Sequence, residues 1–168
     1  DNLLCQFNEE WDRFALDNES AEQLAGKLTG TSLLDHISDR TLRHLTEQLI
    51  DRVRKEGVTI RLPMRCDSPD TIREMEIELA PAGERKVRFS VELIGTRSRR
   101  PVALLDPDAT RSADLVYLCS WCKRMAHEGH WKVLEEAIRS LSVFEKEPVP
   151  QVSHGMCPDC RDRLLAEL

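Results

Sequence analysis

Two Cys-x-x-Cys pairs constrain this chain more than any other feature of its sequence. Cys119 and Cys122 form the first pair, Cys157 and Cys160 form the second, and 34 residues separate the inner cysteines. In a Cys-x-x-Cys turn both thiolates can point to one side, so two such pairs can close a tetrahedron around one ion. The spacing predicts one structural zinc ion per chain. Four thiolates leave no coordination position for water or substrate, which argues against metal catalysis.

The same cysteines allow two other interpretations, an iron site and a dithiol redox pair. Cys157-Pro158-Asp159-Cys160 has the form of an oxidoreductase dithiol. We expect it to lack the strand followed by a helix that positions and activates such a thiolate, so redox chemistry is the alternative to zinc. His154 lies three residues before Cys157. We expect His154 to form a hydrogen bond with a ligating sulfur, with direct ligation as the alternative, because four cysteines already complete the coordination.

The remaining histidines and the other motifs point away from catalysis. His127 and His130 follow the first cysteine pair on a polar turn and are expected to be solvated, and His36 and His44 are expected to be ordinary surface or core side chains. The sequence contains no nucleophile motif, phosphate-binding glycine loop or histidine-rich catalytic cluster. We therefore expect no enzyme activity.

Composition narrows the class of protein further. The net charge is −6 and the isoelectric point is near 5.4, so no broad positive field is available to attract nucleic acid or an anionic membrane. No apolar run is long enough to cross a bilayer, and the first residues lack the basic and apolar regions of a signal peptide. The other two cysteines, Cys5 and Cys66, lie in apolar strand patterns. Reduced thiols and the missing signal peptide predict a cytoplasmic protein.

Apolar periodicity predicts an α+β fold for the first half of the chain. Helical spacing predicts helices over residues 9–16, 21–25 and 39–56, the last ending at Gly57. Residues 3–7 are predicted to form a short strand, and alternation predicts three more strands over residues 58–66, 75–79 and 87–93. Three strands joined by turns form an antiparallel sheet, and the helices are expected to cover one of its faces.

This order of elements, with FNEEW at its start and a long closing strand, resembles a PAS domain from its second strand onward, over residues 1–95. The resemblance implies a PAS-like sensory or interaction domain with a pocket for a ligand that the sequence does not identify. It places His36 and His44 near the region where a PAS domain can hold a haem. A full PAS sheet has one further strand before Asp1, and the chain has no initiating Met, so we expect it to be trimmed or processed.

Residues 96–113 are predicted to form a connector and residues 114–168 a second module. The arginines of TRSRR are interpreted as part of a solvated linker, with a basic site for a partner as the alternative. In the second module, residues 115–118 lead into the first cysteine pair, residues 131–141 form an amphipathic helix, EKEPVPQ is a loop, and residues 161–168 form a short helix. We expect a small, zinc-stabilised α-helical or knuckle module.

The run from C-S-W-C-K-R-M through W-x-x-L-E-x-A to S-H-G-M-C-P-D-C resembles a cysteine-rich tail found after PAS and related signalling domains in bacteria. Together the two resemblances imply a non-catalytic bacterial signalling protein, a sensor or protein-interaction module acting through a homodimer or a partner protein. The alternative is a thiol redox sensor or oxidoreductase that uses Cys157 and Cys160. A zinc-dependent nucleic-acid binder is disfavoured by the acidity of the chain.

Overall fold

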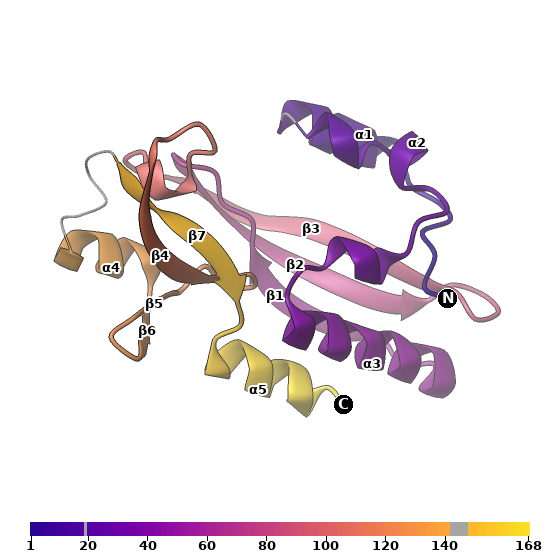
Figure 1. The fold of residues 1–168 in the computed structure, drawn as a ribbon. Coiled ribbons are helices and arrows are strands. Elements are labelled where there is room, and N and C mark those ends of the chain that lie inside the picture. The colour runs from indigo at the N-terminus through magenta and orange to yellow at the C-terminus, as the bar shows by residue number, and fades with distance from the viewer. Residues whose placement is uncertain (19, 142–147) are drawn as a thin grey trace.

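The computed structural model describes residues 1–18, 20–141 and 148–168, and these form an α+β fold with two sheets (Figure 1). The first sheet is antiparallel, has the strand order β1-β2-β3, and consists of β1 (Ile60–Arg65), β2 (Thr71–Pro81) and β3 (Val87–Ser98). The second sheet is mixed, has the order β6-β5-β4-β7, and consists of β4 (Arg111–Cys119), β5 (Met125–His127), β6 (His130–Lys132) and β7 (Val149–Gly155).

Within residues 1–18, 20–141 and 148–168, five α-helices and three short 3-10 turns accompany the sheets. The helices are α1 (Glu9–Asp17), α2 (Ala25–Leu28), α3 (Arg40–Glu56), α4 (Leu134–Leu141) and α5 (Pro158–Ala166) in the described part of the chain. The 3-10 turns are η1 (Ala21–Gln23), η2 (Leu33–His36) and η3 (Ala103–Leu105). In the described residues, no helix is both long enough and apolar enough to cross a membrane.

The longest helix, α3, lies where the sequence predicts it. The side chain of Asp39 accepts a hydrogen bond from the backbone N–H of Leu42 at 2.7 Å and so caps the first turn. Gly57 ends the helix with a left-handed backbone at φ 68°, a conformation that glycine adopts at little cost. Between them the apolar stripe is buried against the first sheet, which confirms the predicted helix.

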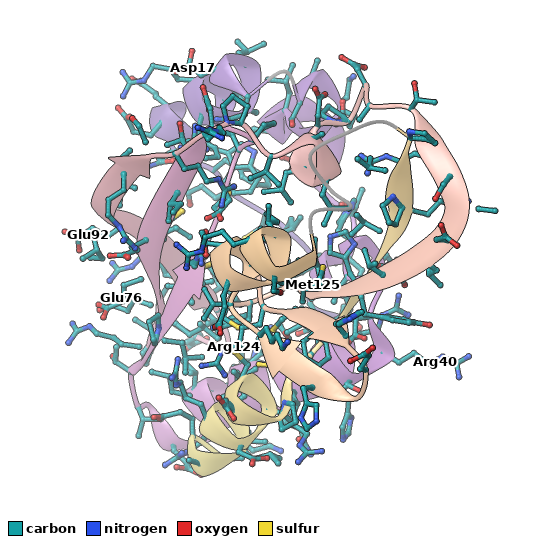
Figure 2. All side chains as sticks on the ribbon, turned by 90° about the vertical axis from the view of Figure 1, so that its left-hand side faces the viewer. Asp17, Arg40, Glu76, Glu92, Arg124 and Met125 are labelled. Carbon is teal, nitrogen blue, oxygen red and sulfur yellow. The ribbon has the colours of Figure 1, made fainter. Side chains whose placement is uncertain are left out.

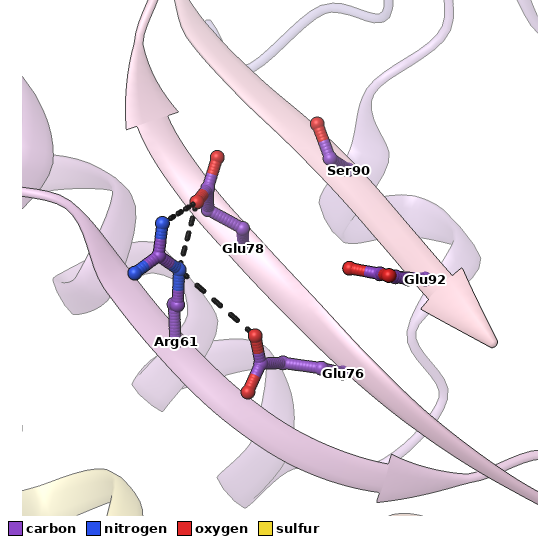
Figure 3. A pocket seen from close by; sticks show the side chains of 5 residues that line it. All are labelled: Arg61, Glu76, Glu78, Ser90 and Glu92. Carbon is purple, nitrogen blue, oxygen red and sulfur yellow. Dashed lines mark hydrogen bonds and ion pairs between the residues drawn. The ribbon is translucent and has the colours of Figure 1, made fainter. Parts of the chain in front are cut away.

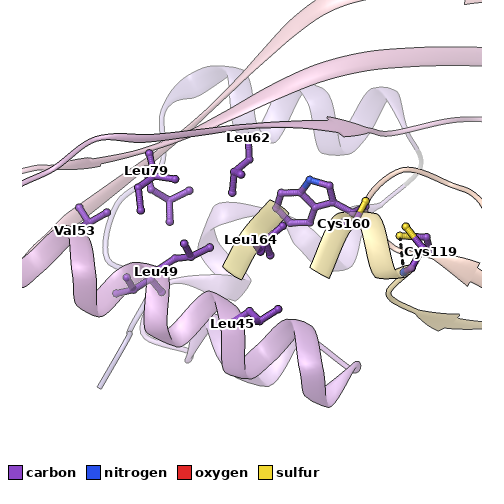
Figure 4. Packing of buried hydrophobic residues seen from close by; sticks show 12 residues of the cluster. Leu45, Leu49, Val53, Leu62, Leu79, Cys119, Cys160 and Leu164 are labelled. Atoms are coloured by element: carbon purple, nitrogen blue, oxygen red, sulfur yellow. Dashed lines mark hydrogen bonds between the residues drawn. The ribbon is translucent and has the colours of Figure 1, made fainter. Parts of the chain in front are cut away.

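The predicted three-stranded antiparallel sheet is also confirmed. Leu79 of β2 lies opposite Ile60 of β1 on one side and opposite Phe89 of β3 on the other, so the apolar residues of all three strands share one face. α3 covers this face over β1, β2 and the start of β3 (Figures 1 and 4). The opposite face is polar and carries Arg61 and Glu78 (Figure 3).

The predicted N-terminal strand over residues 3–7 is wrong. Leu3 makes an isolated bridge with Ser32, and the N–H of Leu4 donates to the carbonyl of Thr31 at 2.9 Å. The segment therefore pairs with the loop before α3 and not with a sheet edge. The neighbouring helix prediction holds, because α1 begins after Asn8, whose side chain caps it.

The second half of the chain differs from the predicted α-helical or knuckle module, because it is built on a four-stranded sheet. β7 begins inside the EKEPVPQ segment predicted to be a loop, of which residues 145–147 lie outside the described residues. Trp131, predicted to start a helix, lies in β6, and α4 begins at Leu134. Pro150 makes the sequence of β7 look unlike a strand. Proline is tolerated there because β7 is an edge strand of the second sheet.

The hydrophobic core does not divide at the predicted module boundary. One cluster joins α3, β1 and β2 to three of the paired cysteines, Trp121 and Leu164 of α5 (Figure 4). A second cluster packs α4 and η3 against β4, β5 and β7. β3 continues past residue 95 and β4 begins within residues 96–113, while the predicted division into 1–95, 96–113 and 114–168 stays a prediction.

A buried ionic cluster ties the first sheet to α4 where the sequence predicts a solvated linker. The Asp67 carboxylate is fully buried and accepts hydrogen bonds from Arg65 at 2.5 Å and from Arg99 at 3.0 Å. Both arginines also pair with Glu135 of α4, at 2.7 and 2.9 Å. Burial opposes the ionisation of Glu135, but its hydrogen bond from Arg65 and the charges of both arginines outweigh it and lower the pKa of Glu135. Arg99 is therefore a structural residue.

The Asp67→Asn substitution tests this cluster. It removes the charge that two partly or wholly buried guanidinium groups share, so we expect the free energy of unfolding to fall by about 3 kcal/mol in a urea titration. Asp162→Asn is the matched control, because Asp162 pairs with Arg161 in an exposed position and should change stability by less than about 1 kcal/mol. Equal effects of the two substitutions would contradict a stabilising role for the cluster.

Candidate metal centre

The parallel pairing of β4 and β7 brings the two cysteine pairs together. Cys119 is the last residue of β4 and lies opposite Gly155, the last residue of β7. Because parallel strands end at the same edge of a sheet, both cysteine pairs leave that edge side by side. Cys157 then occupies the N-cap of α5, with Pro158 at the first helical position and Cys160 in the first turn.

The four cysteine sulfurs form one cluster. The Sγ atoms of Cys119, Cys122, Cys157 and Cys160 all lie within 4.8 Å of one another, and those of Cys122 and Cys157 are 3.6 Å apart. A zinc ion with Zn–S bonds of about 2.3 Å needs sulfurs about 3.8 Å apart along the edges of its tetrahedron. All six cysteines of the chain are free thiols and not disulfides. The four residues predicted to be ligands can therefore hold a metal ion.

Backbone hydrogen bonds shape the turns that present the sulfurs. The N–H of Cys157 donates to Sγ of Cys119 at 3.4 Å, which links one pair to the other. In the first pair, the N–H of Cys119 donates to the carbonyl of Arg124 at 2.7 Å, and the N–H of Lys123 donates to the carbonyl of Cys119 at 3.0 Å. Lys123 has a left-handed backbone, φ 60°, which turns the chain back after Cys122.

Hydrogen bonds between the cysteines shift the pKa values within the cluster. Hydrogen bonds from the thiols of Cys122 and Cys160 lower the pKa of Cys119, so one thiolate is stabilised by its neighbours. Donation to Cys119 raises the pKa of Cys122 to about 11 and also raises the pKa of Cys160. A neighbouring thiolate thus raises the pKa of two of the thiols, and a cation among the sulfurs would favour ionisation of all four. The hydrogen bond to Asp159, together with the charges of Cys122 and Cys157, raises the pKa of Arg124.

The cluster lies inside the protein and not at its surface. Cys119 and Cys157 are fully buried, Cys160 is 2% exposed, and Cys122 is half-buried. Figure 4 shows Leu164 of α5 between the first sheet and α3, with Cys160 and then Cys119 farther along the same cluster. The ligand positions thus belong to the same core as the first sheet.

Trp121, between the first two cysteines, attaches the site to β1. Its indole N–H donates to the carbonyl of Pro63 at 2.6 Å, and its own carbonyl accepts from the N–H of Arg65 at 2.8 Å. β1 is an edge strand of the first sheet, so the turn between Cys119 and Cys122 covers part of its outer edge. The sequence does not predict this contact, because neither Trp121 nor Pro63 carries a signal for a partner so far away in the chain.

The histidines stay outside the sulfur cluster. His154 lies in β7 with an exposed side chain, and within the described residues its ring makes no hydrogen bond to a cysteine sulfur. Partial burial of the ring and the charge of Lys123 lower the pKa of His154. Its predicted role beside a ligand stays a prediction. His36, His44 and His130 are exposed, and His127 is half-buried at the end of β5.

Comparisons with known proteins found no relative of this chain. No protein-family model matches the chain, and neither a curated protein nor a solved structure is significantly similar to it.

Substituting Cys119 tests the link between metal and core. In Cys119→Ser we expect bound metal to be lost. Because a structural zinc contributes on the order of 10 kcal/mol, the first sheet should also lose its cooperative unfolding transition, measured by circular dichroism. Cys5→Ser is the control, since Cys5 is an exposed free thiol outside the cluster and should leave metal content and unfolding unchanged. A metal-free Cys119→Ser protein that unfolds like the unsubstituted chain would contradict the link.

Replacing Trp121 isolates its attachment to β1. Trp121→Phe keeps an aromatic ring but removes the donor to Pro63, so we expect the free energy of unfolding to fall by about 1 kcal/mol while the metal content is unchanged. Trp11→Phe is the matched control, because Trp11 donates to the carbonyl of Gln23 in an exposed position and should cost less. Chemical denaturation with parallel metal analysis measures both effects, and a larger cost at Trp11 would contradict the assignment.

Proposed function

We propose that this chain is a non-catalytic, cytoplasmic signalling module of bacteria in which one structural zinc ion joins a PAS-like sheet to the C-terminal cysteine module. Cys119, Cys122, Cys157 and Cys160 would hold the ion, which supplies a rigid cross-link when bound. The module would pass on its state by contact with a second copy or a partner protein. A small ligand of the PAS-like part belongs to the same proposal.

The burial of the four-sulfur cluster supports this function more than any other observation. A catalytic zinc keeps one coordination position open to water or substrate, whereas four thiolates close the shell. Cys119 and Cys157 are fully buried in the core cluster that also contains Leu45 and Leu49 of α3. An ion held there stabilises the fold and has no route to a substrate. Iron in the same four thiolates is the alternative metal, since tetrahedral sulfur sites suit both ions.

One observation favours the alternative of a thiol redox protein. The expectation that Cys157 and Cys160 lack a strand-then-helix setting is wrong, because β7 leads directly to α5 and Cys157 lies at the N-cap of that helix. A helix N-terminus stabilises a thiolate. Against this alternative, both cysteines are almost completely buried and face the two other thiols, so a disulfide substrate has no access to them.

Thiol titration with and without a chelator separates the two functions. The experiment uses a Cys5→Ser/Cys66→Ser background, so that only the four clustered thiols can react. For the structural site we expect about one zinc per chain, no rapid thiol modification, and full modification after chelation, because zinc-bound thiolates are protected.

A redox protein behaves differently in the same assay. Its purified form would contain little metal, would react without a chelator, and would turn over a disulfide substrate. That combination of results would overturn the proposed function. Elemental analysis also distinguishes zinc from iron.

A further inference from the structure

The outer edge of β3 has no strand beside it in the described part of the chain. Apart from β2, no described element makes a backbone hydrogen bond to β3. Its side chains are exposed along almost the whole strand. The opposite edge of the same sheet is different, since β1 contains Pro63 and is partly covered by the turn around Trp121. An exposed edge of this length is a template for pairing with another strand.

The apolar face of β3 is also left uncovered. Phe89, Val91 and Leu93 lie opposite Leu79, Ile77 and Met75 of β2 and therefore point to the face that α3 covers elsewhere. α3 also contacts β3, where Val87 packs against the core, but it leaves Val91 49% and Leu93 52% exposed. A strand added beside β3 would extend the sheet and shield this apolar row.

The regular part of β3 is complementary to itself. The strand runs without irregularity from Val87 to Leu93, where a bulge opposite Glu74 and Met75 shifts the register. Ser90 is the centre of that stretch. When two copies pair antiparallel about Ser90, Arg88 of each copy lies opposite Glu92 of the other, on the polar face. Phe89 of each copy lies opposite Val91 of the other, on the apolar face.

The exposed side chains of Glu92 and Arg88 can form ion pairs with a second copy. Among the described residues Glu92 forms no ion pair, and it lies next to Glu76 of β2, so two like charges face each other across the sheet. Figure 2 shows both glutamates pointing away from the body of the protein, and Figure 3 shows Glu92 on the same face as Glu76. Arg88 contacts Glu78 at 3.5 Å with an exposed side chain. A second copy would supply Glu92 with an arginine.

We propose that β3 pairs antiparallel with β3 of a second copy about Ser90, which joins the two three-stranded sheets into one continuous sheet. This inference rests on the proposed function, because it names the surface through which a non-catalytic module contacts its own copy. The pairing is symmetric and closed, so it stops at a dimer. The sulfur cluster lies beyond β1, at the other side of the sheet, and stays out of the contact.

Charge reversal on the full chain tests the pairing by sedimentation equilibrium. We expect the unsubstituted protein to dimerise. In Glu92→Arg two symmetric Arg–Glu pairs become Arg–Arg pairs, which should raise the dissociation constant at least about tenfold. The same substitution places an arginine beside Glu76, so the fold itself should not weaken. Arg97→Glu is the control in the same strand, because Arg97 lies beyond the bulge and should leave dimerisation unchanged.

Mixing two variants gives the decisive result. Arg88→Glu alone should also dissociate, but an equimolar mixture with Glu92→Arg should form a heterodimer, because every opposing pair is then of opposite charge. The double variant Arg88→Glu/Glu92→Arg should recover the homodimer. The pairing is overturned if the unsubstituted protein is monomeric, or if neither charge reversal changes the dissociation constant of the dimer. Metal content is measured on each sample. A protein without zinc contradicts the proposed function, whereas a monomer mass in a protein that contains one zinc per chain contradicts only the β3 pairing.

Discussion

The parallel pairing of β4 with β7 is the interaction on which the rest of the structure depends. It places Cys119 opposite Gly155, so that the two cysteine pairs start from one edge of the second sheet. Everything that the cysteines can do follows from this register. A shift of one residue would turn successive side chains to opposite faces and would separate the sulfurs. The strand pairing and the sulfur cluster therefore stabilise each other.

Local periodicity in the sequence accounts for the parts of the fold that were predicted correctly. The apolar stripe of α3 and the alternation in β1, β2 and β3 are repeated over many residues. The sequence therefore predicts helix or strand there without knowledge of the tertiary contacts. The four clustered cysteines were predicted for a similar reason, since spacing within each pair is a local property. These features are set by neighbours in the chain.

The features that sequence analysis missed depend on partners far away in the chain. β7 contains Pro150 and few apolar residues, and it is a strand only because β4 lies beside it. Arg99 looks like a solvated residue of a basic linker, but Asp67 and Glu135 neutralise it inside the protein. Leu3 fails to form a strand because the nearest backbone is a loop. In each case tertiary contacts overrode the local pattern.

The turn that carries Cys119 and Cys122 also protects one of the two edges of the first sheet. The turn around Trp121 hydrogen-bonds to the outer side of β1 and so closes that edge against other chains. The edge at β3 has no such cover among the described residues. The first sheet therefore has one protected edge, at β1, and one exposed edge, at β3. Another chain can extend this sheet only from the β3 edge.

The place of α5 in the core has a consequence for synthesis of the protein. Cys160 and Leu164 pack against Leu45 and Leu49 of α3, which leave the ribosome much earlier. During translation the apolar surface between α3 and the first sheet stays partly exposed until α5 is synthesised. Contacts between residues so far apart in the sequence form slowly. The nascent chain is thus most exposed to aggregation and chaperone binding until Leu164 emerges and closes the interior.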